Sequence, residues 1–483
     1  MSHKYSLLFF ILLIIFQIAL GENIVLNFKT NINSDSLNEE NYMKSTMEQQ
    51  IYVDMKIGES KQVIPMTLKT MKYPTFIVSS NAQEDDILIK YDETKSQNFK
   101  KLTKDEIKNL FIYDFTHGYY VSDSLKLNSS LNYNNFTYIL ATKMNTIVKN
   151  ISGEIGLSKK IENKLNYKYP QKTNFLQNLI DNKIISKYIF GIKYDSEYEG
   201  KLIIGTTLDE VDSQYKKGEE ITNQIDNEVP NNNKDDWLIK FNVKFTKSNS
   251  EQYTESTYGF LQYEIGLIFG SDNYRQNFIA NYFKDKQCTE TVINSSPYSF
   301  YQYTCDREEQ FSDFPDLNLS LEGKYNFTFT KTDLFKKVGN KYFFHIVFQV
   351  TQMNINYWRL GQLFFRKYPT FLSYEGNTSS FLYYSKNKEK KEDGGNTDAP
   401  KTDGSDGEKS DGSDGKDGKE GKNNNGPNNG LVIALSIVIP LIVIAIIIVA
   451  IYFYRKRNKK VDELLSDKVE TEGEKKFAIL NNS

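Results

Sequence analysis

The chain has few of the side chains from which metal sites and nucleophilic centres are built. Its 483 residues include three histidines and two cysteines, and no Cys/His cluster has the spacing of metal ligands. His117 and His345 stand alone, without a neighbouring Ser/Asp signature. No nucleophile elbow or phosphate-binding loop occurs. We therefore predict neither a metal site nor a cofactor.

Charge of one sign is also lacking. The chain has 60 Lys and Arg against 62 Asp and Glu, a net charge of −2, and the two signs are mixed along its length. A surface for nucleic acid needs a concentration of basic side chains. We therefore expect no nucleic-acid partner.

Long hydrophobic runs are scarce, and there are two. Residues 7–20 follow a basic start and precede small residues, which is typical of a secretory signal peptide (1–21), and the run is shorter than the roughly 20 residues of a spanning helix. Residues 431–454 are uncharged and long enough to span, and a basic cluster follows at 455–460. We expect a single-pass type I membrane protein with a cytoplasmic tail, 455–483.

Apolar residues are almost absent from residues 386–430, which are rich in Asp, Gly, Lys and Asn. Such a segment cannot bury enough surface to offset the entropy of ordering, so we predict a disordered stalk. Its Asp-Gly repeats lack the pattern of a calcium loop. The stalk would hold a lumenal or extracellular domain away from a membrane of the secretory pathway, at the cell surface or in the endolysosomal system.

Residues 51–384 are dominated by short runs of Tyr, Phe, Ile, Val and Thr between Asn, Asp, Gly and Ser, a pattern typical of antiparallel β structure. Residues 173–183 are an exception with helical spacing. The segment is too large for one compact core, so we predict a mainly β domain of two lobes, about 51–212 and 235–384. Residues 22–50 are left as an N-terminal segment.

Cys288 and Cys305 both lie in the part predicted to be exported. In an oxidising compartment one disulfide is expected, and a pair of free buried thiols is the alternative. Seven Asn-x-Ser/Thr sequons are candidate glycosylation sites and support export. They begin at Asn128, Asn135, Asn150, Asn294, Asn318, Asn326 and Asn377.

Several motifs occur in a characteristic order. They are YVDMKIG (52–58), HGYYVSDSLKL (117–127), SGEIGL (152–157), LIIGTTLDEVD (202–212), GLIFG (266–270), FPDLNLSL (314–321) and YWRLGQLFFRKYPTFLS (357–373). In this order and spacing they resemble the pepsin-like aspartic peptidase family, and the last is the most specific match. The resemblance implies a bilobal double β-barrel and a disulfide in the C-terminal lobe.

The resemblance also assigns the positions of the active site. The two catalytic triplets fall on Lys69, Thr70 and Met71 and on Gln262, Tyr263 and Glu264, and the tyrosine of the flap over the cleft falls near Phe111 or Tyr113. The family's triplets are Asp-Thr-Gly or close variants, so both catalytic aspartates are replaced here.

Aspartic proteolysis needs two carboxylates that share one proton. Lys69 is cationic and Gln262 does not titrate, and Met71 and Glu264 replace glycines that shape the catalytic loops. Lys69 is interpreted either as a solvated loop residue or as a functional cation. In the second case it anchors a ligand carboxylate or pairs with Glu264 to lock the lobes.

We therefore predict a pseudopeptidase that binds peptide or protein in the interlobe cleft. An active membrane-anchored aspartic endopeptidase is the alternative, and a surface-coat protein is the second alternative. The short segment 22–50 leaves little room for an inhibitory pro-segment, which favours a protein without activity to restrain.

Overall fold

The structure is a computed structural model. It describes residues 23–32, 34–72, 74–82, 89–108, 114–127, 131–145, 151–159, 173–223, 237–246, 252–295, 298–321, 325–351, 357–375 and 378–387. The chain divides into two compact units, 1–392 and 393–483, and every described residue belongs to the first. The predicted signal peptide, membrane span and tail lie outside the described residues, as does all but the start of the stalk. No helix among the described residues is long and apolar enough to cross a membrane.

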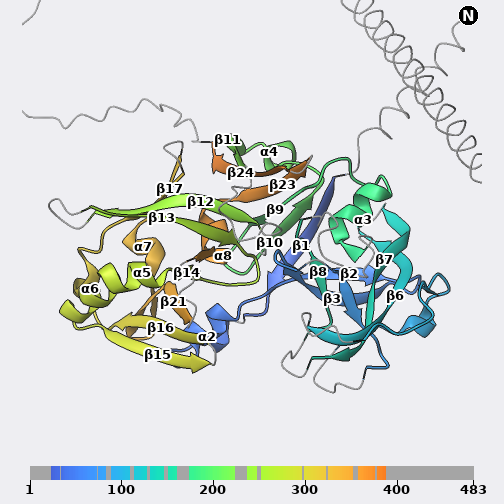
Figure 1. The fold of residues 1–483 in the computed structure, drawn as a ribbon, viewed down its shortest axis with the longest axis horizontal. Helices are drawn as coiled ribbons and strands as arrows, with labels where there is room; N and C mark the ends of the chain where they lie inside the picture. Colours follow the sequence, from blue (N-terminus) through green and yellow to red (C-terminus); the bar gives the residue numbers. More distant parts are fainter. Residues whose placement is uncertain are drawn as a thin grey trace, which may run out of the picture. The chain divides into compact units, whose positions relative to one another are not determined.

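The domain is mainly β and bilobal, with two large sheets (Figure 1). The first sheet has 13 strands, in the order β11 (Tyr215–Asn223), β24 (Thr378–Lys386), β23 (Thr370–Glu375), β9 (Ile189–Tyr194), β10 (Glu199–Ile204), β1 (Ile24–Thr30), β2 (Ile51–Ile57), β3 (Gln62–Lys69), β8 (Gly153–Gly156), β4 (Phe76–Val78), β7 (Asn132–Met144), β6 (Phe115–Lys126) and β5 (Lys100–Lys101). In β2, every second residue is buried, as the two-residue period of a strand with one face on the core requires.

The second sheet has 11 strands. Its order is β18 (Tyr325–Phe329), β17 (Leu317–Leu321), β12 (Leu238–Thr246), β13 (Gln252–Leu261), β22 (Trp358–Leu360), β14 (Ile268–Gly270), β21 (Ile346–Thr351), β16 (Tyr298–Cys305), β20 (Lys341–Phe344) and β19 (Phe335–Val338), with β15 (Thr289–Ser295) paired to β16.

The two sheets differ in closure. β2 pairs with β3 and also with β6, so six strands of the first sheet, β2, β3, β8, β4, β7 and β6, form a closed barrel. No pairing within the described residues closes the second sheet into a ring. Of the predicted double β-barrel, a closed barrel is therefore seen in the first lobe among the described strands. Closure depends on pairing between strands distant in sequence, which the pattern of each strand does not reveal.

The helices among the described residues are short. They are α2 (Tyr42–Met47), α3 (Phe175–Asp181), α4 (Leu208–Val211), α5 (Asp272–Tyr274), α6 (Ala280–Asp285), α7 (Lys331–Leu334) and α8 (Gln362–Lys367), with single turns η1 (Ser34–Ser36), η2 (Glu93–Lys95), η5 (Arg275–Ile279) and η6 (Glu308–Phe311). The helix predicted at 173–183 is confirmed as α3, and the side chain of Asn174 caps it by accepting from the Gln177 N–H.

The first sheet includes two parts that the sequence analysis assigned elsewhere. β1, from the N-terminal segment, pairs with β10 and β2, and β23 and β24, from the end of the second lobe, pair with β9 and β11. A strand's own pattern does not reveal a partner so distant in sequence. Both ends of the domain are therefore built into one sheet.

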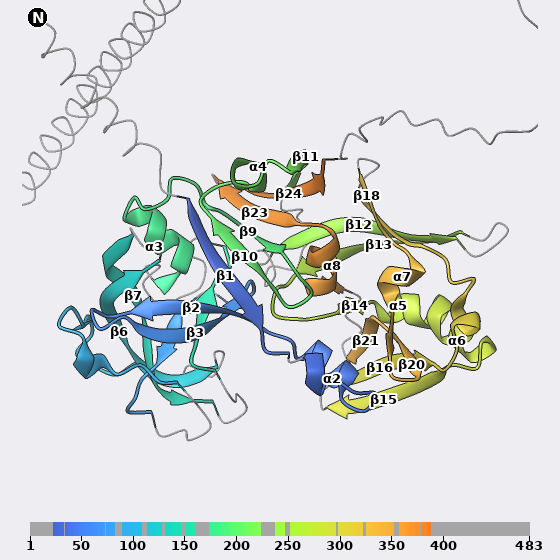
Figure 2. The ribbon, with the colours of Figure 1, turned by 180° about the vertical axis from the view of Figure 1, so that it is seen from behind.

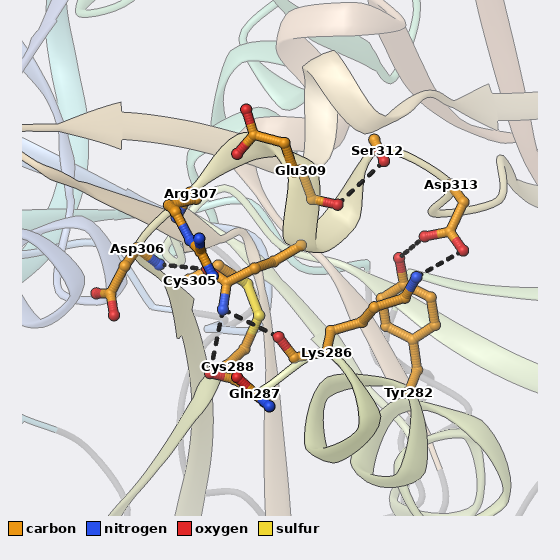
Figure 3. Close-up of a disulfide and its surroundings, with 11 residues drawn as sticks. Tyr282, Lys286, Gln287, Cys288, Cys305, Asp306, Arg307, Glu309, Ser312 and Asp313 are labelled. Atoms are coloured by element: carbon orange, nitrogen blue, oxygen red, sulfur yellow. Dashed lines mark hydrogen bonds and ion pairs between the residues drawn. A yellow bond between two sulfur atoms is a disulfide. The ribbon is translucent and has the colours of Figure 1, made fainter.

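The predicted disulfide between Cys288 and Cys305 is confirmed, and it closes the base of the β15–β16 hairpin (Figure 3). Gln310 ties the two sides of this base together. Its side chain donates to the carbonyls of Lys286 and Gln287 and accepts from the N–H groups of Asp306 and Arg307.

Candidate functional site

The first degenerate triplet lies at the end of β3. Lys69 is the last residue of the strand and pairs in register with Gly156 of β8, and its carbonyl accepts from the Leu157 N–H at 2.9 Å. Thr70 and Met71 form the turn that follows. The turn therefore has a fixed position, since β8 supports it from the side.

The second triplet lies between β13 and β14. The Gln262 N–H donates to the Leu360 carbonyl at 3.0 Å, while the Tyr263 ring is buried with its edge against Phe190 and Phe365. The side-chain oxygen of Gln262 is buried and makes no hydrogen bond within the described part of the chain. This triplet is held by its backbone and by Tyr263, not by a polar network around Gln262.

The structure brings the two triplets together through one carboxylate. Glu264 Oε2 accepts from the Thr70 hydroxyl at 2.7 Å and from the Thr70 N–H at 3.1 Å, and Oε1 accepts from the Met71 N–H at 3.2 Å. The Tyr263 N–H donates to Thr70 Oγ1 at 3.4 Å. Four of the predicted site residues, Thr70, Met71, Tyr263 and Glu264, thus form one hydrogen-bonded junction between the lobes.

Lys69 is not a solvated loop residue, because its side chain is only 13% exposed. Its Nζ lies 3.7 Å from Oε1 of Glu154, a β8 side chain that is 2% exposed. One of the interpretations given above paired Lys69 with Glu264. The charge of Glu264 does help to raise the pKa of Lys69, but the Glu264 oxygens accept hydrogen bonds from Thr70 and Met71, and the ion pair of Lys69 is with Glu154.

The sequence analysis missed Glu154. It stands in SGEIGL, where it is the one charged residue in an otherwise uncharged and buried strand. A charge in the middle of a buried strand needs a partner. That signal could have directed attention to a cation nearby.

A second carboxyl and a second lysine extend this cluster. Lys72 Nζ lies 3.6 Å from Oδ1 of Asp114, and Asp114 hydrogen-bonds to Glu154. Lys69, Glu154, Asp114 and Lys72 are called the charged cluster below. Two cations thus face two carboxyls in this partly buried group.

The environment moves the pKa values of the cluster apart. Burial raises the pKa of Glu154 well above its usual value, with Asp114 adding to the rise and Lys69 opposing it. Burial works against ionised Asp114, but the hydrogen bond with Glu154 and the charge of Lys72 lower its pKa. Burial works against charged Lys69, but Glu154, Glu264 and Asp114 outweigh it and raise its pKa. Lys69 therefore stays protonated and cannot act as a base.

The remaining predicted positions divide into two groups. Phe111 and Tyr113, the flap candidates, lie outside the described residues, as do the sequons at Asn128, Asn150 and Asn377. Asn135 and Asn326 are exposed, Asn318 accepts from the Thr328 hydroxyl, and Asn294 lies in β15. No group of three or more His, Cys, Asp or Glu side chains in the described ranges is arranged to hold a metal ion.

The comparison with protein families agrees with this architecture. The family model for eukaryotic aspartyl proteases matches residues 50–382, which is more than half of the chain. A search among curated proteins finds no match. With the matched region covering both triplets and both lobes, the chain belongs to the eukaryotic aspartyl protease family.

Proposed function

We propose that this chain is a catalytically inactive member of the family that binds a peptide or protein segment between its lobes. The observation that carries the proposal is the pair of residues at the catalytic positions. One carboxylate must activate a water while its partner protonates the scissile carbonyl. A protonated Lys69 and an amide at Gln262 provide neither function.

The junction between the triplets supports the same conclusion. Glu264 occupies the N–H groups of the Thr70–Met71 turn and joins the lobes there. The arrangement is a polar contact in which one carboxylate accepts three hydrogen bonds. It supports a role for this region in holding the lobes around a ligand.

An activity assay tests the proposal. The full-length chain is incubated with unfolded protein from pH 3 to 7, with and without a transition-state mimic that inhibits aspartic peptidases, and an active pepsin-like peptidase serves as the positive control. We expect no inhibitor-sensitive cleavage by this chain. Cleavage that the inhibitor stops would overturn the proposal.

Binding is tested with a blocking variant. Met71 is partly buried beside Leu238 and Phe260, so Met71→Trp adds bulk at the junction, while Val211→Trp adds the same bulk at an exposed position on α4. Peptides captured from a library should be lost with Met71→Trp and kept with Val211→Trp. Capture that neither variant changes, or no capture at all, would favour the surface-coat alternative.

A second candidate function, an active membrane-anchored endopeptidase, is favoured by one observation. Asp114 and Glu154 are hydrogen-bonded carboxyls whose pKa values are shifted in opposite directions, as in acid and base pairs. If the wild-type chain cleaves protein, Asp114→Asn should abolish cleavage and Gln262→Met should not. If neither substitution abolishes cleavage, Asp114 and Glu154 are excluded as the catalytic pair.

The proposal includes membrane attachment, with export directed by residues 1–21 and anchoring by residues 431–454. Protease added to sealed cells or vesicles should digest a tag placed after Ser483 only where the cytosolic face of the membrane is accessible to it. It should digest residues 51–384 only where the lumenal or extracellular face is accessible. Release of the whole chain by alkaline carbonate would contradict an anchored protein.

A further inference from the structure

Among the described residues, five strands lie at the edges of the two sheets. The first sheet ends in β5 and β11, the second ends in β18 and β19, and β15 has β16 as its one neighbour. An edge strand presents backbone N–H and C=O groups that can pair with a strand of another chain. Lysine side chains are a common protection against such pairing. The edges of this domain are therefore places where a protective device is expected.

Three of the five edge strands carry two adjacent lysines. β5 is Lys100–Lys101, and the same dipeptide stands at 216–217 in β11 and at 336–337 in β19. Both lysines are exposed in β5 and in β19. The pairing of β11 with β24 also shifts its register between Lys217 and Glu220, an irregularity that hinders the addition of a further strand. These three edges therefore have the protection expected.

The edge strand β15 has no lysine and exposes apolar side chains. Val292 and Ile293 are 42% and 40% exposed, and they point to opposite faces because successive side chains of a strand alternate. The one charged residue of β15, Glu290, accepts from the Tyr303 hydroxyl and lies 3.9 Å from Arg275. All of β15 pairs with β16 in a continuous register. The strand is therefore a regular edge without a free charge, and it suits pairing with another chain.

The edge strand β18 has no charged residue. Its Thr328 N–H donates to the Tyr368 hydroxyl at 2.8 Å, and this hydroxyl donates to the Thr328 carbonyl at 2.7 Å. Residues of an antiparallel strand alternate between facing the partner strand and facing away, so the backbone groups of Asn326 face away from β17, as those of Thr328 do. Tyr368 thus covers one outward-facing residue of β18, and Asn326 is the other.

Each of the two edges without lysine contains a sequon. Asn294 begins Asn-Ser-Ser in β15, and Asn326 begins Asn-Phe-Thr in β18. Asn326 is exposed, and Asn294 directly follows the exposed Val292 and Ile293. The three edges with paired lysines contain no sequon. Lysine pairs and sequons therefore divide the five edges between them.

We propose that N-linked glycans at Asn294 and Asn326 protect the edges of β15 and β18, as the lysine pairs protect β5, β11 and β19. A glycan is bulky and hydrophilic, so beside the outer backbone groups of a strand it excludes a strand of a second copy. Figure 2 shows β15 and β18 at opposite margins of the second lobe, so each glycan serves one edge. The inference goes beyond the proposed binding function, and it requires the export that is proposed above.

Peptide mass spectrometry of the full-length chain, produced in a eukaryotic host that attaches N-glycans, gives the first test. Enzymatic release of an N-glycan converts the occupied asparagine to aspartate, which changes the mass of its peptide. We expect this conversion at Asn294 and at Asn326. An unmodified asparagine at either position would overturn the inference.

Sedimentation velocity of the purified full-length chain in detergent gives the second test. Asn294→Gln and Asn326→Gln should each raise the self-associated fraction by roughly tenfold, because each opens one edge for pairing. Asn135→Gln is the matched control, since Asn135 is exposed but lies in β7, which stands between β4 and β6 within its sheet. The inference fails if the two edge variants sediment as wild type does, or if the control associates as they do.

Lysine in place of both asparagines separates edge protection from other effects of a glycan. Asn294→Lys/Asn326→Lys removes both sequons, yet it gives each edge the residue that the other three edges carry. This variant should sediment as wild type does, whereas Asn294→Gln/Asn326→Gln should associate. Association of both double variants would overturn the inference. Where a glutamine variant does not fold, trimming each glycan of the folded wild-type chain to its first sugar replaces it, and unchanged sedimentation after trimming would overturn the inference as well.

Discussion

Lys69 and Gln262 stand at matching points of the two lobes, each at the end of a strand and just before the turn that meets the other lobe. On the Lys69 side the replacement carries a charge, and Glu154 and Asp114 surround it. On the Gln262 side the replacement is neutral, and its side-chain oxygen has no hydrogen-bond partner in the described residues. A buried charge has to be matched by others, whereas a neutral amide can be tolerated without such a network.

This difference predicts that the largest loss of stability follows from breaking the charged cluster. Lys69→Met leaves the buried carboxyls of Glu154 and Asp114 without the cation that faces them, and removing one partner of a buried ion pair costs about 3–5 kcal/mol. We expect the free energy of unfolding, measured by urea denaturation at pH 7, to fall by about 3 kcal/mol. Lys341→Met, at an exposed position of β20, is the matched control.

The double variant Lys69→Met/Glu154→Gln sharpens this result. Because it removes both members of the pair, it should recover much of the loss seen in Lys69→Met alone. A double-mutant cycle measures the coupling. Purely additive effects of the two substitutions would mean that the pair does not interact.

The junction between the triplets should give the next largest effect. Glu264→Ala removes an acceptor of three hydrogen bonds from Thr70 and Met71, and a hydrogen bond to a charged group contributes about 1.5–3 kcal/mol net. The three bonds share one carboxylate, so their contributions do not add in full. We expect a loss of about 2–3 kcal/mol in thermal or urea unfolding. Thr70→Val removes one of these contacts and should cost less. An equal loss in the two variants would show that the carboxylate is not the centre of the junction.

The charged cluster should also make stability depend on pH. The pKa of Glu154 is raised from about 4.5, so above that pH the folded chain keeps a proton that the unfolded chain has released. Stability then falls as the pH rises from about 4.5 toward the folded pKa. Asp114 acts oppositely, since its lowered pKa means that stability is lost as the pH falls below about 3.8. Urea midpoints should therefore be highest in mild acid.

Glu154→Gln tests the origin of this pH dependence. The substitution removes the group whose pKa is raised, so the decline of the urea midpoint between pH 4.5 and 7.5 should become shallower. An unchanged decline would assign the pH dependence to other groups.

Much of the fold could be predicted because the motifs that carry it are local. The mainly β character and the helix at Phe175 follow from patterns within short stretches, and the pairing of Cys288 with Cys305 follows from the presence of only two cysteines. The residues with which those stretches pair in space cannot be predicted from such patterns. Glu154 meets Lys69 through the pairing of β3 with β8, across 85 residues of sequence, and no local period encodes that distance.

The candidate site was predicted by position and not by contact. Thr70 and Glu264, one from each predicted triplet, meet in a hydrogen bond, but the partner of Lys69 and the contact of Tyr42 with the second lobe were missed. Tyr42 lies in residues 22–50, which were assigned only as an N-terminal segment, and its helix α2 has six residues. Which sheet such a short segment covers is decided by tertiary packing.

The smallest effect should come from Gln262, and it completes the comparison. Gln262→Met keeps a similar side-chain length and removes a buried oxygen that has no hydrogen-bond partner in the described part of the chain. A buried acceptor left unpaired costs about 1–3 kcal/mol, so its removal should offset the loss of other contacts and leave the free energy of unfolding within about 1 kcal/mol of wild type. Lys69→Met makes the same new side chain on the other side of the junction, where it leaves Glu154 and Asp114 facing each other without their cation. Measured side by side by urea denaturation, the two methionine variants should differ clearly, with Lys69→Met the less stable. If Gln262→Met is as destabilising as Lys69→Met, Gln262 is held by a polar network of its own. The residues that replace the two catalytic acids would then be accommodated in the same way in both lobes.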